Sequence, residues 1–250
     1  MFQAGKAATT AKEMVRYNLS VLGLGETRWT QSGEVKLPSG QSVIYSGHEE
    51  DGENHTDGVP IMPKETRKAL IAWEPISSCL ITASFRTNNR RVKAHIIQCY
   101  APTNDAVNDV KARFYDSLNH LLGRVGARDL IILMDDFNAK IGGRNEGYEE
   151  VKGKHGVGKM NENGEMFVET CVNNNLVIGG SVFPHTTIHK TTWVSPDHVT
   201  ENQTHHICIC RKFRRSMEDV RTRRRADAAS DHRLPVTKAE EKSPVQKSKS

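Results

Sequence analysis

The sequence has no long apolar run, and its cysteines are few and scattered. No stretch of 18 consecutive apolar residues occurs in the 250 residues, which excludes a membrane-spanning helix and predicts no membrane partner. The N-terminal region has no apolar segment long enough for a secretory signal peptide, so we expect a cytoplasmic or nuclear protein. The five cysteines are odd in number, and we interpret them as small buried side chains in a reducing compartment.

Cysteine and histidine come together at one place, but without the spacing of a metal site. His205 and His206 precede Cys208 and Cys210 by only a few residues. This spacing is not that of a zinc site, and alternate residues of one strand point to the same face. We therefore predict a buried strand over residues 205–210 and no zinc.

The net charge of +5 is unevenly distributed. Residues 211–250 carry 13 Lys/Arg and 6 Asp/Glu, a net charge of +7, whereas residues 1–210 carry 22 and 24, a net charge of −2. A basic C-terminal end suits a polyanionic partner. The alternative is a solvated tail, and for residues 235–250 we expect a polar, disordered tail.

The chain is organised around residues 129–142. Five consecutive apolar residues, 130–134, are typical of a strand buried on both faces. Asp135, Asp136 and Asn138 follow at the carboxyl end of this strand, where ligands bind in α/β proteins. Carboxylates there would hold a hard cation or take a proton from water. The alternative is a capped turn, because Asp and Asn favour such positions for local hydrogen bonds.

Two other predicted strands end in candidate site residues. An apolar strand over residues 19–25 is followed by Glu26, and a strand over residues 92–100 ends in Tyr100 before a proline turn. Each has an ordinary alternative, because Glu26 would also suit a solvent-exposed strand end and Tyr100 a half-buried position with its hydroxyl at the surface.

The remaining pattern predicts a sheet-rich α/β protein without internal repeats. We expect helices over residues 5–18, over 107–126 and from residue 161, hairpins over 36–47 and over 79–100, and short strands at 59–62, 176–178 and 191–194. Roughly ten strands with three or four helices indicate two packed sheets with helices outside.

The order of the polar and acidic residues at the strand ends resembles the order found in a known family. Glu26, Tyr100, Asp136, Asn138, Asp231 and His232 occur in this order. Together with the segments LGLGETRW, YSGHEE, IIQCYAPTND, ILMDDFNAKIG, NENGEMF, NNLVIGG, FPHTTIHKTTWVSPDH and ASDH, they resemble the endonuclease/exonuclease/phosphatase superfamily. Within this superfamily the chain resembles the endonuclease domain of RTE-type non-LTR retrotransposons, over one domain, residues 1–234.

The resemblance implies a four-layer α/β-sandwich of two packed, mostly antiparallel sheets, and a phosphodiesterase that depends on Mg²⁺ or Mn²⁺ and nicks DNA as a monomer. It implies that Glu26 binds the metal with Asp231 nearby, that Asp136 activates water oriented by Asn138, that Tyr100 and His232 contact the phosphate, and that Thr103, Asn104 and Trp193 bind substrate. A metal and a histidine would offset charge growing on the phosphoryl oxygens.

Four departures from the family pattern predict reduced activity. The family begins with a strand that precedes the first residues of this chain, and that strand carries an active-site Asn. At position 205 the family has an Asp that orients the catalytic histidine, and here it is His205. The family has Gly where this chain has Asp135, and two adjacent carboxylates would influence each other's ionisation. Pro235 and the polar end stand where a last core strand is expected.

These departures leave two alternatives to a DNA endonuclease. One is a non-catalytic nucleic-acid-binding protein, a decayed remnant of the fold whose affinity comes from the Arg-rich residues 211–225. The other is a phosphoesterase of the same fold that acts on a small phosphate ester.

Overall fold

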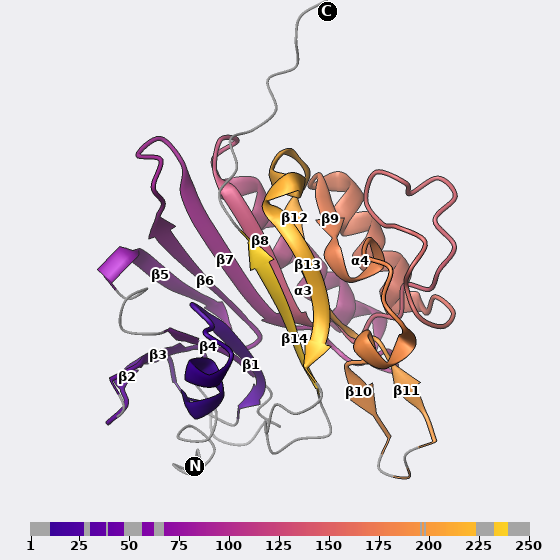
Figure 1. The fold of residues 1–250 in the computed structure, drawn as a ribbon, viewed down its shortest axis with the longest axis horizontal. Helices are drawn as coiled ribbons and strands as arrows, with labels where there is room; N and C mark the ends of the chain where they lie inside the picture. The colour runs from indigo at the N-terminus through magenta and orange to yellow at the C-terminus, as the bar shows by residue number, and fades with distance from the viewer. Residues whose placement is uncertain are drawn as a thin grey trace, which may run out of the picture.

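The structure, a computed structural model, is an α/β fold in which two sheets face each other (Figure 1). It describes residues 11–27, 31–38, 40–47, 57–62, 68–195, 197, 199–223 and 233–239, without the side chains of residues 26, 27 and 57–62. Among the described residues, no helix is long and apolar enough to cross a membrane.

The larger sheet has six strands in the order β5-β6-β7-β8-β12-β9. Their bounds are Leu70–Ser77 (β5), Leu80–Arg86 (β6), Lys93–Tyr100 (β7), Leu130–Asp136 (β8), His205–Cys210 (β12) and Leu176–Ile178 (β9). The pair β7 and β8 is parallel, and helix α3 (Asn108–Arg124) connects them. The other neighbouring strands are antiparallel.

The smaller sheet has four antiparallel strands in the order β1-β4-β3-β2. They are Leu22–Thr27 (β1), Gly33–Lys36 (β2), Ser42–Tyr45 (β3) and Asp57–Met62 (β4). Two hairpins complete the strands, one of Trp193–Val194 (β10) with Glu201–Asn202 (β11), the other of Met217–Arg223 (β13) with Leu234–Ala239 (β14). The 3₁₀ helices are Gly179–Ser181 (η1), Thr187–His189 (η2) and Arg211–Ser216 (η3).

The packing of apolar side chains on both faces of each sheet accounts for the layered arrangement. Alternate residues of the six-stranded sheet point to opposite faces. Ile81 and Phe85 of β6 pack with Ile44 of the smaller sheet, whereas Leu133 of β8 belongs to the core beneath α3 and α4 (Glu162–Asn173). Met14, in the helical segment 11–16, packs on the outer side of the smaller sheet (Figure 1). The predicted four-layer order of helix, sheet, sheet and helix is confirmed.

The helices begin and end where their sequences favour it. In α3 the buried apolar residues recur at helical spacing, as Phe114, Leu118, Leu121 and Leu122 do. In α4 the side chain of Asn161 accepts a hydrogen bond from the backbone N–H of Gly164, a typical N-cap.

Two expectations need correction. The predicted disordered tail from residue 235 is wrong for its first residues, because Leu234–Ala239 form β14 and pair with β13, with Pro235 opposite Thr222. A last strand is therefore present despite Pro235. Pro60 lies within β4, opposite Gly23 of β1, so the short strand expected at 59–62 is present.

Candidate active site

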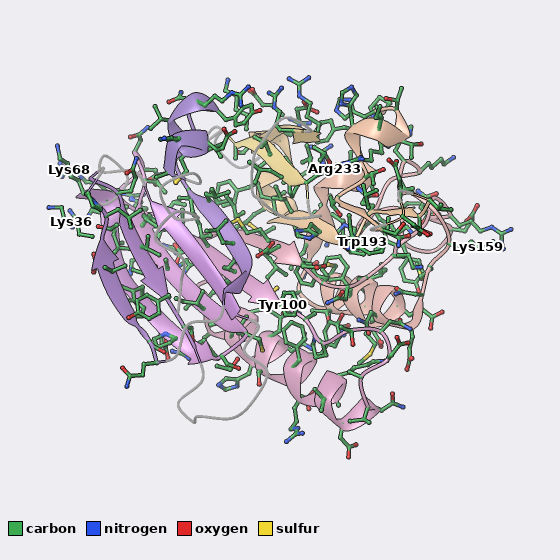
Figure 2. The ribbon with its side chains drawn as sticks, turned by 90° about the horizontal axis from the view of Figure 1, so that it is seen from below. Lys36, Lys68, Tyr100, Lys159, Trp193 and Arg233 are labelled. Carbon is green, nitrogen blue, oxygen red and sulfur yellow. The ribbon has the colours of Figure 1, made fainter. Side chains whose placement is uncertain are left out.

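Three strands bring Tyr100, Asp136 and His205 to one end of the larger sheet. The parallel register of β7 and β8 sets Tyr100 beside Asp136, and the antiparallel register of β8 and β12 sets His205 opposite Asp136. Figure 2 views the molecule from this end and shows Tyr100 near the middle, with Trp193 and Arg233 on the same side of the molecule. The register of these strands therefore brings two of the candidate site residues, Tyr100 and Asp136, side by side.

Asp136 is a buried carboxylate with a contact at each of its two oxygens. Its side chain is only 2% exposed. Oδ1 accepts a hydrogen bond of 2.9 Å from the backbone N–H of Asn138, and Oδ2 lies 3.4 Å from Nε2 of His205. A carboxylate with its oxygens fixed in this way presents its remaining lone pairs in a defined direction.

Asn138 shapes the turn after β8. Its backbone adopts a left-handed conformation with φ of 49°, which Asn tolerates better than most residues. Its side-chain Nδ2 donates a hydrogen bond of 2.8 Å to the carbonyl of Ala101, just after β7. Its own carbonyl accepts a hydrogen bond of 3.1 Å from Nδ2 of Asn161. Asn138 therefore joins the ends of β7, β8 and α4.

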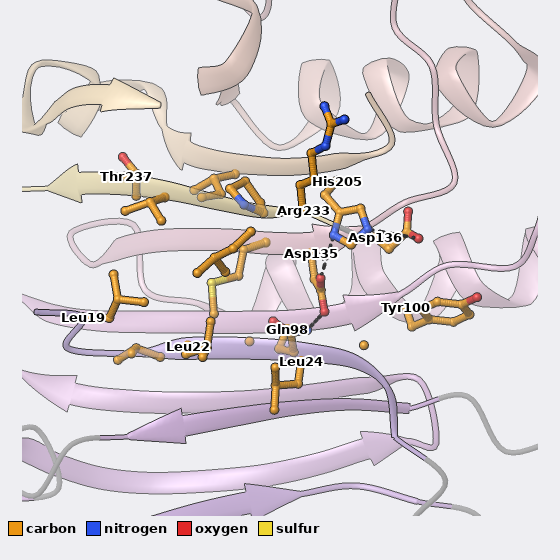
Figure 3. Close-up of a pocket in the computed structure, with 18 residues that line it drawn as sticks. Leu19, Leu22, Leu24, Gln98, Tyr100, Asp135, Asp136, His205, Arg233 and Thr237 are labelled. Atoms are coloured by element: carbon orange, nitrogen blue, oxygen red, sulfur yellow. Dashed lines mark hydrogen bonds and ion pairs between the residues drawn. The ribbon is translucent and has the colours of Figure 1, made fainter. Parts of the chain in front are cut away.

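A cavity of about 180 Å³ opens beside these residues. It is lined by apolar side chains of β1 and β14 and by a polar group on β7, β8 and β12 (Figure 3). The polar group consists of Gln98, Asp135, Asp136 and His205. Nδ1 of His205 lies 3.1 Å from Oδ1 of Asp135, and Nε2 of Gln98 donates to Oδ2 of Asp135.

The end of β1 lies against the same group. A Cβ placed on Gly25 would come within 3.3 Å of Oδ2 of Asp135 and 3.4 Å of Cδ2 of Tyr100. The backbone of Glu26, the next residue, therefore reaches the candidate site, although its side chain lies outside what the structure describes. Asp231 and His232 also lie outside the described residues, so their predicted roles stay predictions.

The three predicted substrate contacts lie in the loop after β7 and in β10. Thr103 is exposed in the turn after β7, and Trp193 is partly exposed in β10. Oδ1 of Asn104 accepts a hydrogen bond of 3.4 Å from the backbone N–H of Asn163 in the first turn of α4. Asn104 thus has a structural bond that the sequence pattern did not reveal.

Carboxylate oxygens at strand ends suit a hard cation, and Mg²⁺ needs only one or two carboxylates because it keeps several waters. Among the described residues, no group of three or more His, Cys, Asp or Glu side chains could hold a metal ion. Asp135 and Asp136 supply oxygen donors, and the strand that carries Glu26 ends beside them. This edge therefore offers carboxylate oxygens, which are the type of ligand that Mg²⁺ and Mn²⁺ prefer.

The cysteines and His206 form part of the core. All five cysteines are free thiols, and burial raises the pKa of Cys99 and Cys208 well above the usual value. His206 is 1% exposed, its Nε2 donates a hydrogen bond of 2.8 Å to the carbonyl of Ala139, and its ring stacks on Phe167. Burial lowers the pKa of His206 to about 4, so the ring is neutral near pH 7.

The basic stretch begins at the opposite end of β12. This strand has six residues and spans about 17 Å from His205 to Cys210. Beyond it, Arg211 bonds Asn175 at 2.6 Å, and Arg214 lies 5.0 Å from the ring centroid of Phe183. Arg211 and Arg214 of η3 therefore contact loops that lie far from the candidate site.

Sequence reasoning missed Gln98 and the contact between Asp135 and His205. Gln98 is fully buried in β7, and its Oε1 has no hydrogen-bond partner among the described residues. A single amide residue within the otherwise apolar run Ile96–Tyr100 was a signal for it. The contact between residues 135 and 205 depends on the register of two strands that lie far apart in the chain.

The chain is similar to known proteins in both sequence and fold. It is 32% identical to craniofacial development protein 2 of Bos taurus over 235 residues, which are 94% of this chain and 38% of that protein. The homologue of Tragulus javanicus is also 32% identical. The chain is a homologue of craniofacial development protein 2. It spans about two fifths of the length of these relatives. No protein-family profile matches the chain.

Solved structures share the fold. The endonuclease domain of TRAS1, a telomere-specific non-LTR retrotransposon, superposes with a TM-score of 0.62 at 15% identity over 94% of this chain and 91% of that one. An endonuclease/exonuclease/phosphatase family protein from Leptotrichia buccalis gives 0.62 at 13%, covering 95% and 93%. A 3' phosphatase, NExo from Neisseria, bound to a product DNA hairpin, gives 0.65 at 16%, covering 93% and 93%. This homologue therefore has the endonuclease/exonuclease/phosphatase fold.

Proposed function

We propose that the chain is a phosphodiesterase that depends on a divalent metal, Mg²⁺ or Mn²⁺, and nicks DNA as a monomer. The observation that carries the proposal is the position of Asp136, a buried carboxylate held by the N–H of Asn138 at the joint carboxyl ends of β7 and β8. The likeness in fold to a retrotransposon endonuclease domain and to a phosphatase bound to a DNA product supports DNA as the substrate.

In this proposal Asp136 accepts the proton of the attacking water. The amide oxygen of Asn138 accepts a hydrogen bond from that water, while its Nδ2 holds the carbonyl of Ala101. Tyr100, beside Asp136 at the end of β7, contacts the scissile phosphate. His232 donates a hydrogen bond to a phosphoryl oxygen, and Thr103, Asn104 and Trp193 contact the DNA.

Glu26 and Asp231 would hold the metal, which supplies positive charge against the anionic phosphodiester when it is bound. We expect a low turnover, because His205 stands where the family has the Asp that orients the catalytic histidine. The position of β1, which ends beside Tyr100 and Asp135, supports the role of Glu26.

Plasmid nicking tests the proposal. The chain is incubated with supercoiled plasmid and Mg²⁺, with Mn²⁺, or with EDTA, beside Asp136→Ala and a matched control, Asp116→Ala, at an exposed position of α3. We expect nicking that EDTA abolishes, that Asp136→Ala lowers by at least about 100-fold and that Asp116→Ala leaves unchanged. Nicking equal in the chain and in Asp136→Ala would overturn the proposal.

A further inference from the structure

Asp135 has a backbone conformation that its residue type disfavours. Its φ is 108°, a left-handed value that favours glycine and strains other residues. Such strain persists only where surrounding contacts determine the conformation, and it gathers at functional sites. The strand β8 ends one residue later, at Asp136.

The strained backbone places the Asp135 side chain on the face of the sheet that faces the cavity. Strand alternation would send it to the face of His206, its partner across β12, whose ring packs in the core. Instead Asp135 lines the cavity with Asp136 and His205, accepts a hydrogen bond from Gln98 and lies 3.1 Å from Nδ1 of His205 (Figure 3).

The ring of His205 thereby connects two carboxylates. Its side chain is 9% exposed, Nδ1 faces Asp135 at 3.1 Å, and Nε2 faces Oδ2 of Asp136 at 3.4 Å. Ionised carboxylates only accept hydrogen bonds, so the ring donates to both only as the imidazolium, with a proton on each nitrogen. Arg233 also lines the cavity, but its Nη2 is paired with Glu201 at 3.0 Å.

We propose that Asp135 and His205 are positioning residues for Asp136. Asp135 fixes the ring of His205, and the second ring nitrogen fixes Oδ2 of Asp136, while the N–H of Asn138 fixes Oδ1. The carboxylate is then presented to substrate in one orientation. This inference rests on the proposed role of Asp136 in DNA nicking. Strand β8 bears the backbone strain that this arrangement requires.

The first test is kinetic and uses Asp135→Asn and Asp135→Gly. Asp135→Asn keeps the size of the side chain, and Asp135→Gly suits the φ of 108°. We expect kcat for plasmid nicking to fall at least about 10-fold in both variants, with KM within about twofold of the unmodified chain. We expect the melting temperature of Asp135→Gly to be equal or higher. A structural role alone would lower stability and activity together, so an unchanged kcat in either variant overturns the inference.

The second test asks whether Asp135 acts through His205. In a His205→Gln background, Asp135→Asn should produce no further loss of kcat, because its partner is already gone. A further loss as large as in the unmodified chain would show that Asp135 acts independently of His205, and would overturn the positioning role of the pair.

A spectroscopic test separates this inference from the proposed function. Long-range ¹H–¹⁵N spectra report the protonation of each ring nitrogen, and the signals of His205 are assigned by their absence in His205→Gln. We expect protons on both nitrogens, with Nδ1 shifted by Asp135→Asn and Nε2 by Asp136→Asn. If the chain nicks no DNA above Asp136→Ala, the proposed function fails, whereas ring signals unaffected by both substitutions overturn the positioning contact itself.

Discussion

Gly23 of β1 lies directly against the side chain of Gln98 of β7. A Cβ at position 23 would come within 1.9 Å of Oε1 of Gln98, and Gln98 is fully buried and bonded to Asp135. Only a residue without a side chain lets the smaller sheet approach the larger one this closely. This contact sets the depth at which the end of β1 reaches the candidate site.

We expect Gly23→Ala to lower the free energy of unfolding by about 1–3 kcal/mol, because the added methyl group overpacks a buried contact. Urea denaturation measures the change. The matched control is Gly123→Ala in α3, where an added Cβ meets nothing within 4 Å and should raise stability by about 0.5–1 kcal/mol. A Gly23→Ala variant as stable as the control would contradict this packing.

Asn138 should respond differently to glycine and to alanine. Asn138→Gly keeps access to the left-handed backbone at φ of 49° but loses the hydrogen bond to Ala101, whereas Asn138→Ala loses both. We therefore expect Asn138→Ala to be less stable than Asn138→Gly by about 1 kcal/mol, measured by thermal denaturation. Nicking should fall in both variants, and a more stable alanine variant would be inconsistent with the backbone role.

His206 should make the protein sensitive to mild acid. Its pKa is about 4 in the folded chain and 6.5 in the unfolded one, so the unfolded state binds more protons between these values. Stability is therefore lost as pH falls below 6.5. Between pH 7 and pH 5 the loss from this one ring is about 2 kcal/mol. Urea denaturation at both pH values should show a smaller difference for His206→Phe, and an equal difference would rule out His206 as the cause.

Arg233, at the candidate site, and Arg215, in η3 beyond the other end of β12, should differ in their contribution to DNA binding. Arg233 lines the candidate site, and its Nη1 is buried without a hydrogen-bond partner among the described residues, whereas Arg215 is exposed in η3. We expect Arg233→Ala to raise the KM for plasmid nicking several-fold and to reduce by about 1 the slope of log affinity against log salt concentration. Arg215→Ala should leave both quantities unchanged. The reverse result would favour binding through the basic C-terminal stretch.

The sequence was sufficient for the local elements and for part of the site. The run 130–134 predicted β8 and helical spacing predicted α3, because each signal is local. The sequence also identified Tyr100 and Asp136 as residues at strand ends, and the register of β7 and β8 places them side by side. The resemblance to the superfamily predicted the arrangement of the layers, which local sequence patterns do not determine.

The sequence misled where contacts cross the sheet. His205 and Asp135 looked like two separate departures from the family pattern, but the register of β8 and β12 brings their side chains within 3.1 Å. The positive φ of Asp135 reverses the alternation on which a strand prediction relies. Pro235 suggested the end of the fold, although one missing N–H is tolerated in a strand of a two-stranded hairpin.

The position of β12 in the larger sheet has a consequence for synthesis of the chain. β12 lies between β8 and β9, yet it is the last of the six strands to be made. When the nascent chain has emerged only as far as β9, the strands β8 and β9 both lack β12, which lies between them in the folded sheet. Each of them therefore has an unpaired edge. Until residues 205–210 leave the ribosome, these two edges are open to other chains, and a chaperone that covers them would serve the protein at this stage.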